Sequence, residues 1–227
     1  MADPVLIGIT GKAFSGKDTA FSLIEEWAEE RGVRAVRRAF ADNIKLSFAR
    51  LFIPDISREE ALVWCDRLKA NGAIRLDDVR DVNEQRTTLS EEITVRLALQ
   101  RYGTECHRNL FGLDFWIDQL LPLDDEDGNN WLGNFWYGFG VEWPQICVVT
   151  DVRFNDEALR VIDLGGMNLR IRRKSNEPDE DSHVSEHGIS DGLVDFTINN
   201  NGTIDNLRTS VHDWLDARVA DRLVFRD

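Results

Sequence analysis

The sequence has 227 residues and a formal net charge of −14 at pH 7, and 42% of its residues are hydrophobic. This length suits one α/β domain with insertions, or one domain with a small lid, and the composition argues against a disordered chain. The negative charge disfavours an extended nucleic acid as a partner, whereas a free nucleotide needs only a local basic pocket.

No apolar run approaches the roughly 20 residues that a membrane-spanning helix needs, and the chain starts without a basic leader. Cys65, Cys106 and Cys147 show neither paired nor metal-ligand spacing, so we expect each to be a buried structural thiol. These features predict a cytoplasmic protein that makes no membrane contact.

The first element is an apolar strand, Val5 to Thr10, which leads into the stretch G-K-A-F-S-G-K-D-T at residues 11–19. A helical pattern follows and ends at Gly32. A glycine-rich turn between a strand and a helix presents backbone N–H groups that surround a polyphosphate, while Lys17 would neutralise the outer oxygens. This pattern predicts a phosphate-binding loop, although a turn with incidental glycines has the same outline.

Asp18 stands where the common phosphate-loop pattern has Ser or Thr, whose hydroxyl normally ligates Mg²⁺. In one interpretation Asp18 meets the metal directly or through water. In the other, Asp18 caps the helix and Thr19 supplies the hydroxyl one position later.

A second strand is expected over residues 33–40, followed by a helix over about 43–52. At their junction Asp42 is predicted to cap the helix, and Lys45 to point back toward the ligand crevice. A cap with a solvent-exposed lysine is the alternative. Residues 55–92 resemble a polar helical insertion.

The next amphipathic helix is predicted over Ile93 to Tyr102, and Gly103 is expected to interrupt it. Arg96, Arg101 and Arg108 gather around that glycine. The planar fork of arginine suits a phosphate better than an ammonium does, whereas surface salt bridges are the alternative for each arginine.

Residues 122–145 combine acidic residues with many aromatic ones. They form either an ordered excursion that packs on its own rings or a surface for a partner subunit, as in a homodimer.

The β-branched run Ile146 to Thr150 predicts a strand that is buried on both faces. Asp151 follows it, and a carboxylate at this place in a doubly wound phosphate-loop protein lies beside the loop. There it would hold Mg²⁺ through water or accept a proton from an attacking oxygen. Arg153 would balance the charge that develops during transfer.

After a helix over 156–164, a strand is predicted from Met167 to Arg172. Arg173 follows this strand and leads into a polar loop over 174–188. Loops of this size near a site act as lids, with arginines that reach the transferring group. A short strand at 196–198 and a final helix follow. Strands separated by helices predict a parallel sheet that binds ligands outside its carboxyl ends.

The motifs occur in the order G-x-x-x-S-G-K-D-T, F-A-D-x-I-K, Q-x-x-G-T-E, F-W, D-V-R-F-x-x-E, S-H-x-S-E and I-N-N-N-G-T. In this order they resemble the bacteriophage deoxynucleoside monophosphate kinases. The resemblance spans most of the chain, includes Gly-Lys-Asp-Thr in the phosphate loop, and is weakest over 55–92 and 122–145.

This resemblance implies a P-loop α/β fold like that of nucleoside monophosphate (NMP) kinases. Such a fold has three α/β/α layers around a parallel sheet, a helical NMP-binding part over 40–121 and a lid over 174–188, all within one kinase domain, 1–227. It implies transfer of the γ-phosphoryl group of ATP, with Mg²⁺, to a deoxynucleoside monophosphate (dNMP), which becomes the diphosphate (dNDP). A phage-encoded enzyme would act in the cytoplasm of an infected bacterial host.

The resemblance also implies roles for individual residues, with Asn200 and Gly202 flanking the adenine. The residues assigned to ATP are Gly11, Ser15, Gly16, Lys17, Asp18, Thr19, Asn200 and Gly202. Those assigned to Mg²⁺ are Asp18, Thr19 and Asp151. Those assigned to the acceptor are Asp42, Lys45, Arg96 and Arg108. Those assigned to the transfer itself are Lys17, Asp151, Arg153 and Arg173.

Three other functions remain open at this point. The first is a kinase for another small acceptor, such as phosphomevalonate, and the second is a kinase for modified bases in phage DNA. The third is a nucleotide-binding regulator that has lost phosphoryl transfer. The net charge disfavours the DNA substrate, since no extended basic track is visible.

Overall fold

The computed structural model describes residues 4–70, 94–122, 145–174 and 188–223. The chain divides into two compact units, one made of residues 1–40 and 117–227 and the other of residues 41–116. The stretches expected to form the aromatic insertion and the lid, 122–145 and 174–188, lie almost wholly outside the described residues.

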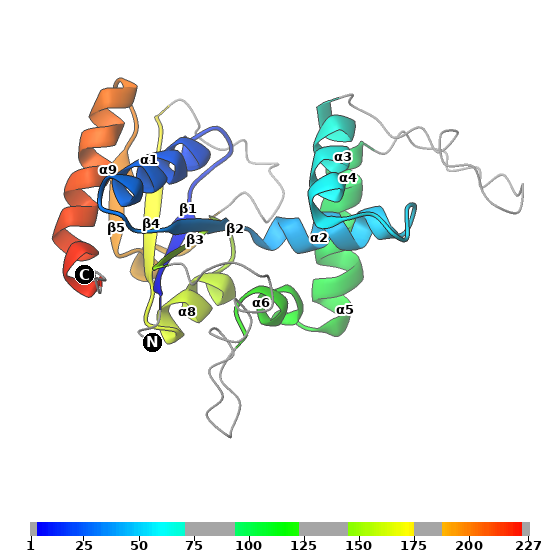
Figure 1. Cartoon of the computed structure of the whole chain (residues 1–227). Helices are drawn as coiled ribbons and strands as arrows, with labels where there is room; N and C mark the ends of the chain where they lie inside the picture. The colour runs from blue at the N-terminus through cyan, green and yellow to red at the C-terminus, as the bar shows by residue number, and fades with distance from the viewer. Residues whose placement is uncertain (1–3, 71–93, 123–144, 175–187, 224–227) are drawn as a thin grey trace, which may run out of the picture. The chain divides into compact units, whose positions relative to one another are not determined.

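The first unit is built on a five-stranded sheet in the order β2-β3-β1-β4-β5, in which every neighbouring pair is parallel (Figure 1). The strands are β1 (Val5–Thr10), β2 (Ala35–Arg38), β3 (Ile146–Val152), β4 (Met167–Arg172) and β5 (Phe196–Asn199). The predicted parallel α/β fold is therefore confirmed.

The central strands end together at one edge of this sheet. Thr10 of β1 pairs with Val152 of β3 on one side and with Arg170 of β4 on the other. The segments that follow these three strands therefore begin side by side, where an open α/β sheet binds its ligands.

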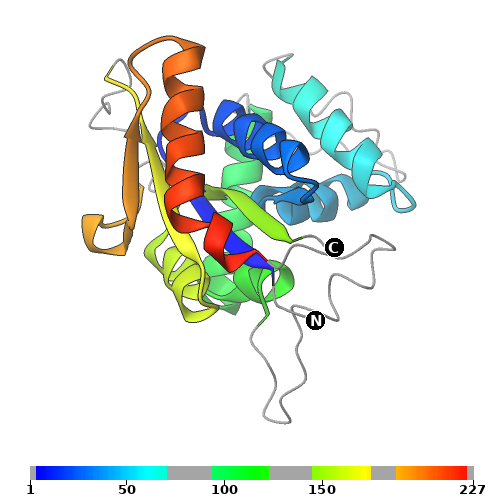
Figure 2. The ribbon, with the colours of Figure 1, turned by 60° about the vertical axis from the view of Figure 1, so that its left-hand side comes forward.

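Helices cover both faces of the sheet, which gives three layers. Val5, Ile7 and Ile9 alternate along β1 and pack with α1 (Lys17–Glu30) and α9 (Ile204–Arg218), which lie next to each other in Figures 1 and 2. Leu6 points the opposite way, as the period of a strand requires, and packs with α6 (Phe115–Leu120) and α8 (Asn155–Asp163).

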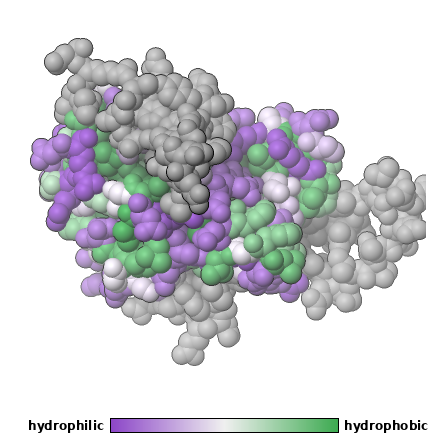
Figure 3. Space-filling view, turned by 90° about the horizontal axis from the view of Figure 1, so that it is seen from below, coloured by the Kyte–Doolittle hydropathy of each residue, from purple (hydrophilic) through white to green (hydrophobic). Residues whose placement is uncertain are grey.

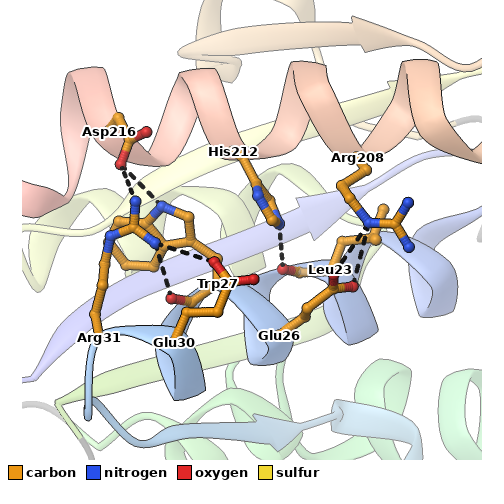
Figure 4. A network of polar contacts seen from close by, with 8 residues as sticks. All are labelled: Leu23, Glu26, Trp27, Glu30, Arg31, Arg208, His212 and Asp216. Atoms are coloured by element: carbon orange, nitrogen blue, oxygen red, sulfur yellow. Dashed lines mark hydrogen bonds and ion pairs between the residues drawn. The ribbon is translucent and has the colours of Figure 1, made fainter.

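Polar contacts join α1 to α9 (Figure 4). The fully buried Trp27 donates from Nε1 to Oδ1 of Asp216 at 2.9 Å. Arg31 binds the same oxygen at 2.9 Å, and its guanidinium carbon lies 4.2 Å from the centroid of the Trp27 ring. Arg208 binds Glu26 further along the helices, at 3.1 Å. These contacts fix α1, whose first turn belongs to the phosphate loop.

The second unit is helical and has its own apolar core, which includes Phe48, Ala49, Cys65, Val95 and Leu99. Its helices are α2 (Phe40–Arg50), α3 (Arg58–Ala70), α4 (Val95–Gln100), a π-helical stretch (Arg101–Arg108) and α5 (Asn109–Phe111). Short 3₁₀ turns at Asp191–Leu193 and Ala220–Arg222 belong to the first unit.

Gly103 does not interrupt the helix, so that prediction is wrong. The backbone passes through it in wide π-helical turns, and a Cβ there would lie 2.9 Å from Cδ1 of Ile44. Side chains bond two carbonyls of the stretch: Trp116 Nε1 donates to Gly103 at 2.9 Å, and His107 Nδ1 donates to Tyr102 at 2.6 Å. Gly103 is needed for close packing rather than for a break.

The expectation for the cysteines is correct at two positions and wrong at one. Cys65 and Cys147 are buried, and complete burial raises the pKa of the Cys147 thiol to about 12. Cys106 is exposed on the π-helical stretch.

Within the described ranges, no helix is both long and apolar enough to cross a membrane. On the face drawn in Figure 3, hydrophilic and hydrophobic residues are interspersed.

Candidate active site

The turn between β1 and α1 has the backbone that the glycines predicted. Gly11 has φ 148 and Gly16 has φ 101, in the region that favours glycine. A Cβ on Gly11 would lie 2.3 Å from the carbonyl oxygen of Ile171, and one on Gly16 would lie 2.4 Å from Nδ2 of Asn200. Both positions therefore need glycine for conformation and for space.

Lys17 is the first residue of α1, and its side chain turns back over the loop. Its Nζ donates to the carbonyls of Gly11 at 2.7 Å and Lys12 at 2.8 Å. The first helical backbone bond is accepted by Gly16 from Ala20, so the N–H groups of the first turn have no partner within the helix. The ammonium and these N–H groups supply the positive end of an anion site.

Ser15 gives an independent indication of a ligand. Its side chain is 1% exposed, and its Oγ is buried without a hydrogen-bond partner among the described residues. A Cβ on Gly11 would lie 2.7 Å from this oxygen, so the hydroxyl faces the part of the loop that glycine keeps open. A buried hydroxyl normally has a partner, and a phosphate oxygen held in the loop would provide one.

Asp18 does not cap α1, because the N-cap residue is Gly16 and no side chain caps the helix there. Asp18 is exposed in the first turn and Thr19 is partly exposed beside it. No cluster of three or more His, Cys, Asp or Glu side chains that would hold a metal occurs within the described ranges. Mg²⁺ accepts carboxylate and hydroxyl oxygens, keeps several waters and takes few protein ligands when phosphates supply the others. The donor types of Asp18, Thr19 and Asp151 therefore suit the ion, and their assignment to it stays a prediction.

Asp151 lies in β3, one residue before the end of the strand, and is 9% exposed. Its Oδ1 accepts a hydrogen bond of 2.8 Å from the backbone N–H of Phe40, the first residue of α2. The prediction that Asp42 caps α2 is therefore wrong: the helix begins two residues earlier, and Asp151 binds its first N–H group. Asp42 is buried within the first turn, 3.9 Å from Arg58.

Arg153 follows β3 with an exposed side chain, and Glu157 holds its backbone. Oε2 of Glu157 accepts from the N–H groups of Arg153 at 2.7 Å and Phe154 at 3.0 Å. Glu157 is 5% exposed and received no role from the sequence. A Glu three residues after the N-cap residue of a helix commonly binds the backbone N–H of that residue. Glu157 stands at this position after Phe154, at the start of α8, so its spacing could have identified it from the sequence.

The turn after β5 contacts the phosphate loop. Asn200 donates from Nδ2 to the carbonyl of Ser15 at 2.9 Å, and its backbone N–H bonds to the carbonyl of Arg172 at 2.7 Å. Gly202 leaves room for Asn206, since a Cβ there would lie 2.6 Å from its Oδ1. Whether Asn200 and Gly202 also flank an adenine stays a prediction.

The residues predicted to hold the acceptor belong to the second unit. Lys45 binds Asp66 of α3 at 2.9 Å, and Lys69 lies 3.5 Å from the same carboxylate. Partial burial and the nearby Lys45 lower the pKa of Lys69. The sequence did not identify Asp66 as a partner, because the contact depends on how two consecutive helices, α2 and α3, pack together.

Arg96 and Arg108 lie on α4 and at the end of the π-helical stretch. Arg96 is exposed, whereas Arg108 is only 9% exposed. Arg101 is exposed and lies 4.0 Å from Glu105 on the same stretch. Burial distinguishes Arg108 from an ordinary surface arginine, because arginine is rarely buried without partners.

Comparison with known proteins agrees with the resemblance. The deoxynucleotide monophosphate kinase family matches residues 52–211, a range that begins after the phosphate loop. A protein of Acanthamoeba polyphaga mimivirus assigned as a deoxynucleotide monophosphate kinase is 28% identical over 218 residues, with 93% of this chain and 96% of that protein covered. The deoxynucleoside-5′-monophosphate kinase of Escherichia phage T5 is 22% identical over 265 residues, with 95% and 97% covered.

Among solved structures, the APS kinase CysC of Mycobacterium tuberculosis, in a mutant form, matches with a TM-score of 0.39 and 11% identity, covering 95% of this chain and 99% of that one. The predicted family rests on the sequence matches alone. Since the family match spans more than half of the chain and both viral relatives align along nearly their whole length, the chain belongs to the deoxynucleotide monophosphate kinase family.

Proposed function

We propose that this chain transfers the γ-phosphoryl group of ATP to a deoxynucleoside 5′-monophosphate and releases the diphosphate. The observation that carries the proposal is the phosphate loop. This strand-to-helix turn contains the ammonium of Lys17 and the buried hydroxyl of Ser15, which has no hydrogen-bond partner among the described residues. Membership of the family supports the choice of acceptor.

On the donor side, the backbone N–H groups from Gly11 to Asp18 surround the phosphates of ATP. Lys17 leaves the two carbonyls that it binds and neutralises the outer phosphate oxygens. The hydroxyl of Ser15 gains a phosphate oxygen as its missing partner.

Asp18, Thr19 and Asp151 are the residues that we assign to Mg²⁺, mostly through water. When bound, the ion would offset negative charge on the phosphates. The bond from the backbone N–H of Phe40 to Asp151 orients this carboxylate.

On the acceptor side, Arg96 and Arg108 bind the phosphate of the monophosphate, and Lys45 and Asp42 assist them. For Lys45 this requires a change of partner, because its ammonium binds Asp66. Arginine forks suit a phosphate because they bind two of its oxygens at once.

Arg153 and Arg173 stabilise the charge of the phosphoryl group as it moves between the nucleotides. Transfer of this kind depends on positioning and on electrostatic stabilisation, so no covalent nucleophile is needed. The substrates are small molecules and no nucleic acid is expected. A homodimer formed through residues 122–145 stays an untested proposal.

A coupled assay with ATP and a panel of acceptors tests this function. The panel contains all deoxynucleoside and ribonucleoside monophosphates and phosphomevalonate, with Lys17→Ala protein as the blank. We expect turnover with one or more deoxynucleoside monophosphates. Turnover only with phosphomevalonate would identify another small-molecule kinase, and ATP binding without turnover on any acceptor would indicate a regulator.

A further inference from the structure

We propose that Asn200 and Asn201 form a clamp that holds the phosphate loop on one side and the backbone after Arg173 on the other. In this role they are positioning residues for the donor phosphates and for the transferring group. The inference rests on the proposed function for its catalytic consequence, but its binding test does not need an acceptor.

The clamp lies in the turn between β5 and α9, next to the end of β4 (Figure 2). The backbone N–H of Asn200 donates to the carbonyl of Arg172 at 2.7 Å, which continues the pairing of β5 with β4. On its other side, the turn is fixed by the cap of α9, where Asn206 accepts from the N–H of Thr203 at 3.0 Å and from its hydroxyl at 2.8 Å. The backbone that carries both asparagines is thus held at each end.

The amide of Asn200 reaches the centre of the phosphate loop. Its Nδ2 donates to the carbonyl of Ser15 at 2.9 Å and occupies the space that a Cβ on Gly16 would fill. Ser15 carries the unpartnered hydroxyl and Gly16 is the N-cap of α1, so this contact fixes the point where the loop becomes helix. It thereby orients the N–H groups that would bind phosphate.

Asn201 reaches the opposite way. Its Oδ1 accepts from the backbone N–H of Lys174 at 2.8 Å. Lys174 follows Arg173, the residue proposed to stabilise the moving charge. The bond therefore fixes the chain at the base of that arginine, whose own side chain is exposed.

Such a clamp matters because it adds to the contacts that order the loop. Both of its glycines and Phe14 have positive φ angles, and fixing each backbone residue in one conformation costs conformational entropy. A loop that is held before the ligand arrives loses less entropy on binding.

Holding the phosphate loop is a different role from contacting the adenine of ATP. A ligand that has phosphates but no base distinguishes the two roles. We would titrate Mg·ATP, Mg·GTP and magnesium tripolyphosphate into the full chain by calorimetry, without acceptor. Asn200→Ala should weaken all three by the same factor, about fivefold to tenfold, the value of one hydrogen bond. The ratio of ATP to GTP affinity should stay that of the wild type.

The neighbouring asparagines give matched variants. Asn199→Ala removes an exposed amide at the end of β5 and should leave every affinity and kcat unchanged. Asn201→Ala should leave the tripolyphosphate affinity unchanged and lower kcat, because it releases only the base of Arg173. Thermal unfolding checks that each variant is folded, and Asn200→Ser, whose hydroxyl is too short to reach Ser15, provides a second test of the same loss.

A loss confined to ATP, with tripolyphosphate bound as tightly as by the wild type, would overturn the clamp and favour contact with adenine. Unchanged affinities in Asn200→Ala and Asn200→Ser would also overturn it. A chain that binds these ligands but phosphorylates no deoxynucleoside monophosphate would refute the proposed function while leaving the clamp intact.

Discussion

At the scale of single residues, the phosphate loop contains one polar group that already has hydrogen-bond partners and one that lacks them. The ammonium of Lys17 has two carbonyl partners within 2.8 Å, whereas the buried hydroxyl of Ser15 has none among the described residues. A ligand that replaces the partners of Lys17 and supplies one for Ser15 is favoured on both counts. An anion with several oxygens meets this requirement.

Replacing Lys17 with Ala should reduce the rate of phosphoryl transfer by roughly 10²- to 10³-fold, because one well-placed charge is lost from the transition state. The thermal midpoint should change little, since the side chain is only partly buried at the loop. Lys12→Ala removes an equal charge from the same loop and should cost much less. Steady-state kinetics of both variants check this, and equal losses would show that only net charge matters.

Phe14 tests the strain stored in the loop. It is 85% exposed and has φ 60, a conformation that costs a non-glycine residue about 1–2 kcal/mol. Phe14→Gly removes this cost, whereas Phe14→Ala keeps it. We expect the glycine variant to be about 1 kcal/mol more stable to urea than the alanine variant, after the larger unfolded-state entropy of glycine is included. Identical denaturation midpoints would contradict the φ angle.

At the scale of elements, sequence patterns predicted what is local and missed what is tertiary. The bounds of β1 and β4 are correct, because β1 is a buried apolar run and apolar residues alternate with polar ones along β4. The start of α2 was placed too late, since the acceptor for the N–H of Phe40 is Asp151, more than a hundred residues away. Gly103 was expected to break a helix, but the contact with Trp116 that supports the π-helical turn is also invisible in local sequence.

A substitution where α1 meets α9 should lower the stability of the protein without changing its affinity for ATP. Asp216→Ala leaves Nε1 of the buried Trp27 without its partner, and an unsatisfied buried donor costs about 1–3 kcal/mol. Asp213→Ala removes the same charge from an exposed position of α9 and should be nearly neutral. Urea denaturation measures both, and ATP affinity should be unchanged in each. Equal stability of the two variants would show that the network in Figure 4 contributes nothing.

Substitution of the buried arginine in the π-helical stretch should affect the acceptor nucleotide and not ATP. Arg108→Ala should raise the KM for the acceptor about 10- to 100-fold, as expected for a lost charged hydrogen bond, and spare the KM for ATP. Arg173→Ala should instead lower kcat. Arg101→Ala, an exposed change on the same stretch, should alter neither.

Kinetics with each substrate varied in turn check this division, and circular dichroism checks the fold of the Arg108 variant. Lysine at position 108 should restore little, because an ammonium cannot form the bidentate contact. A defect restricted to ATP in Arg108→Ala would reverse the assignment of the two sides.

At the scale of the whole molecule, the negative charge and the basic site serve different purposes. A net charge of −14 repels long polyanions, while Lys17 and the arginines after β3 and β4 offer local positive charge at one edge of the sheet. The sequence predicted this edge because parallel strands determine it. It did not predict the contact of Asn200 with Ser15, because these residues come from segments that only folding brings together. Glu157 received no role although its contact with the backbone of Arg153 is local.

The central claim is that the γ-phosphoryl group of ATP moves to a deoxynucleoside monophosphate. The most direct measurement supplies ATP labelled with ³²P in the γ position together with each deoxynucleoside monophosphate, and follows the label by chromatography. We expect the label to appear in the β position of the deoxynucleoside diphosphate as ATP is consumed, and not with Lys17→Ala protein. Label that appears only in inorganic phosphate, or that stays in ATP with every deoxynucleoside monophosphate, would contradict the account.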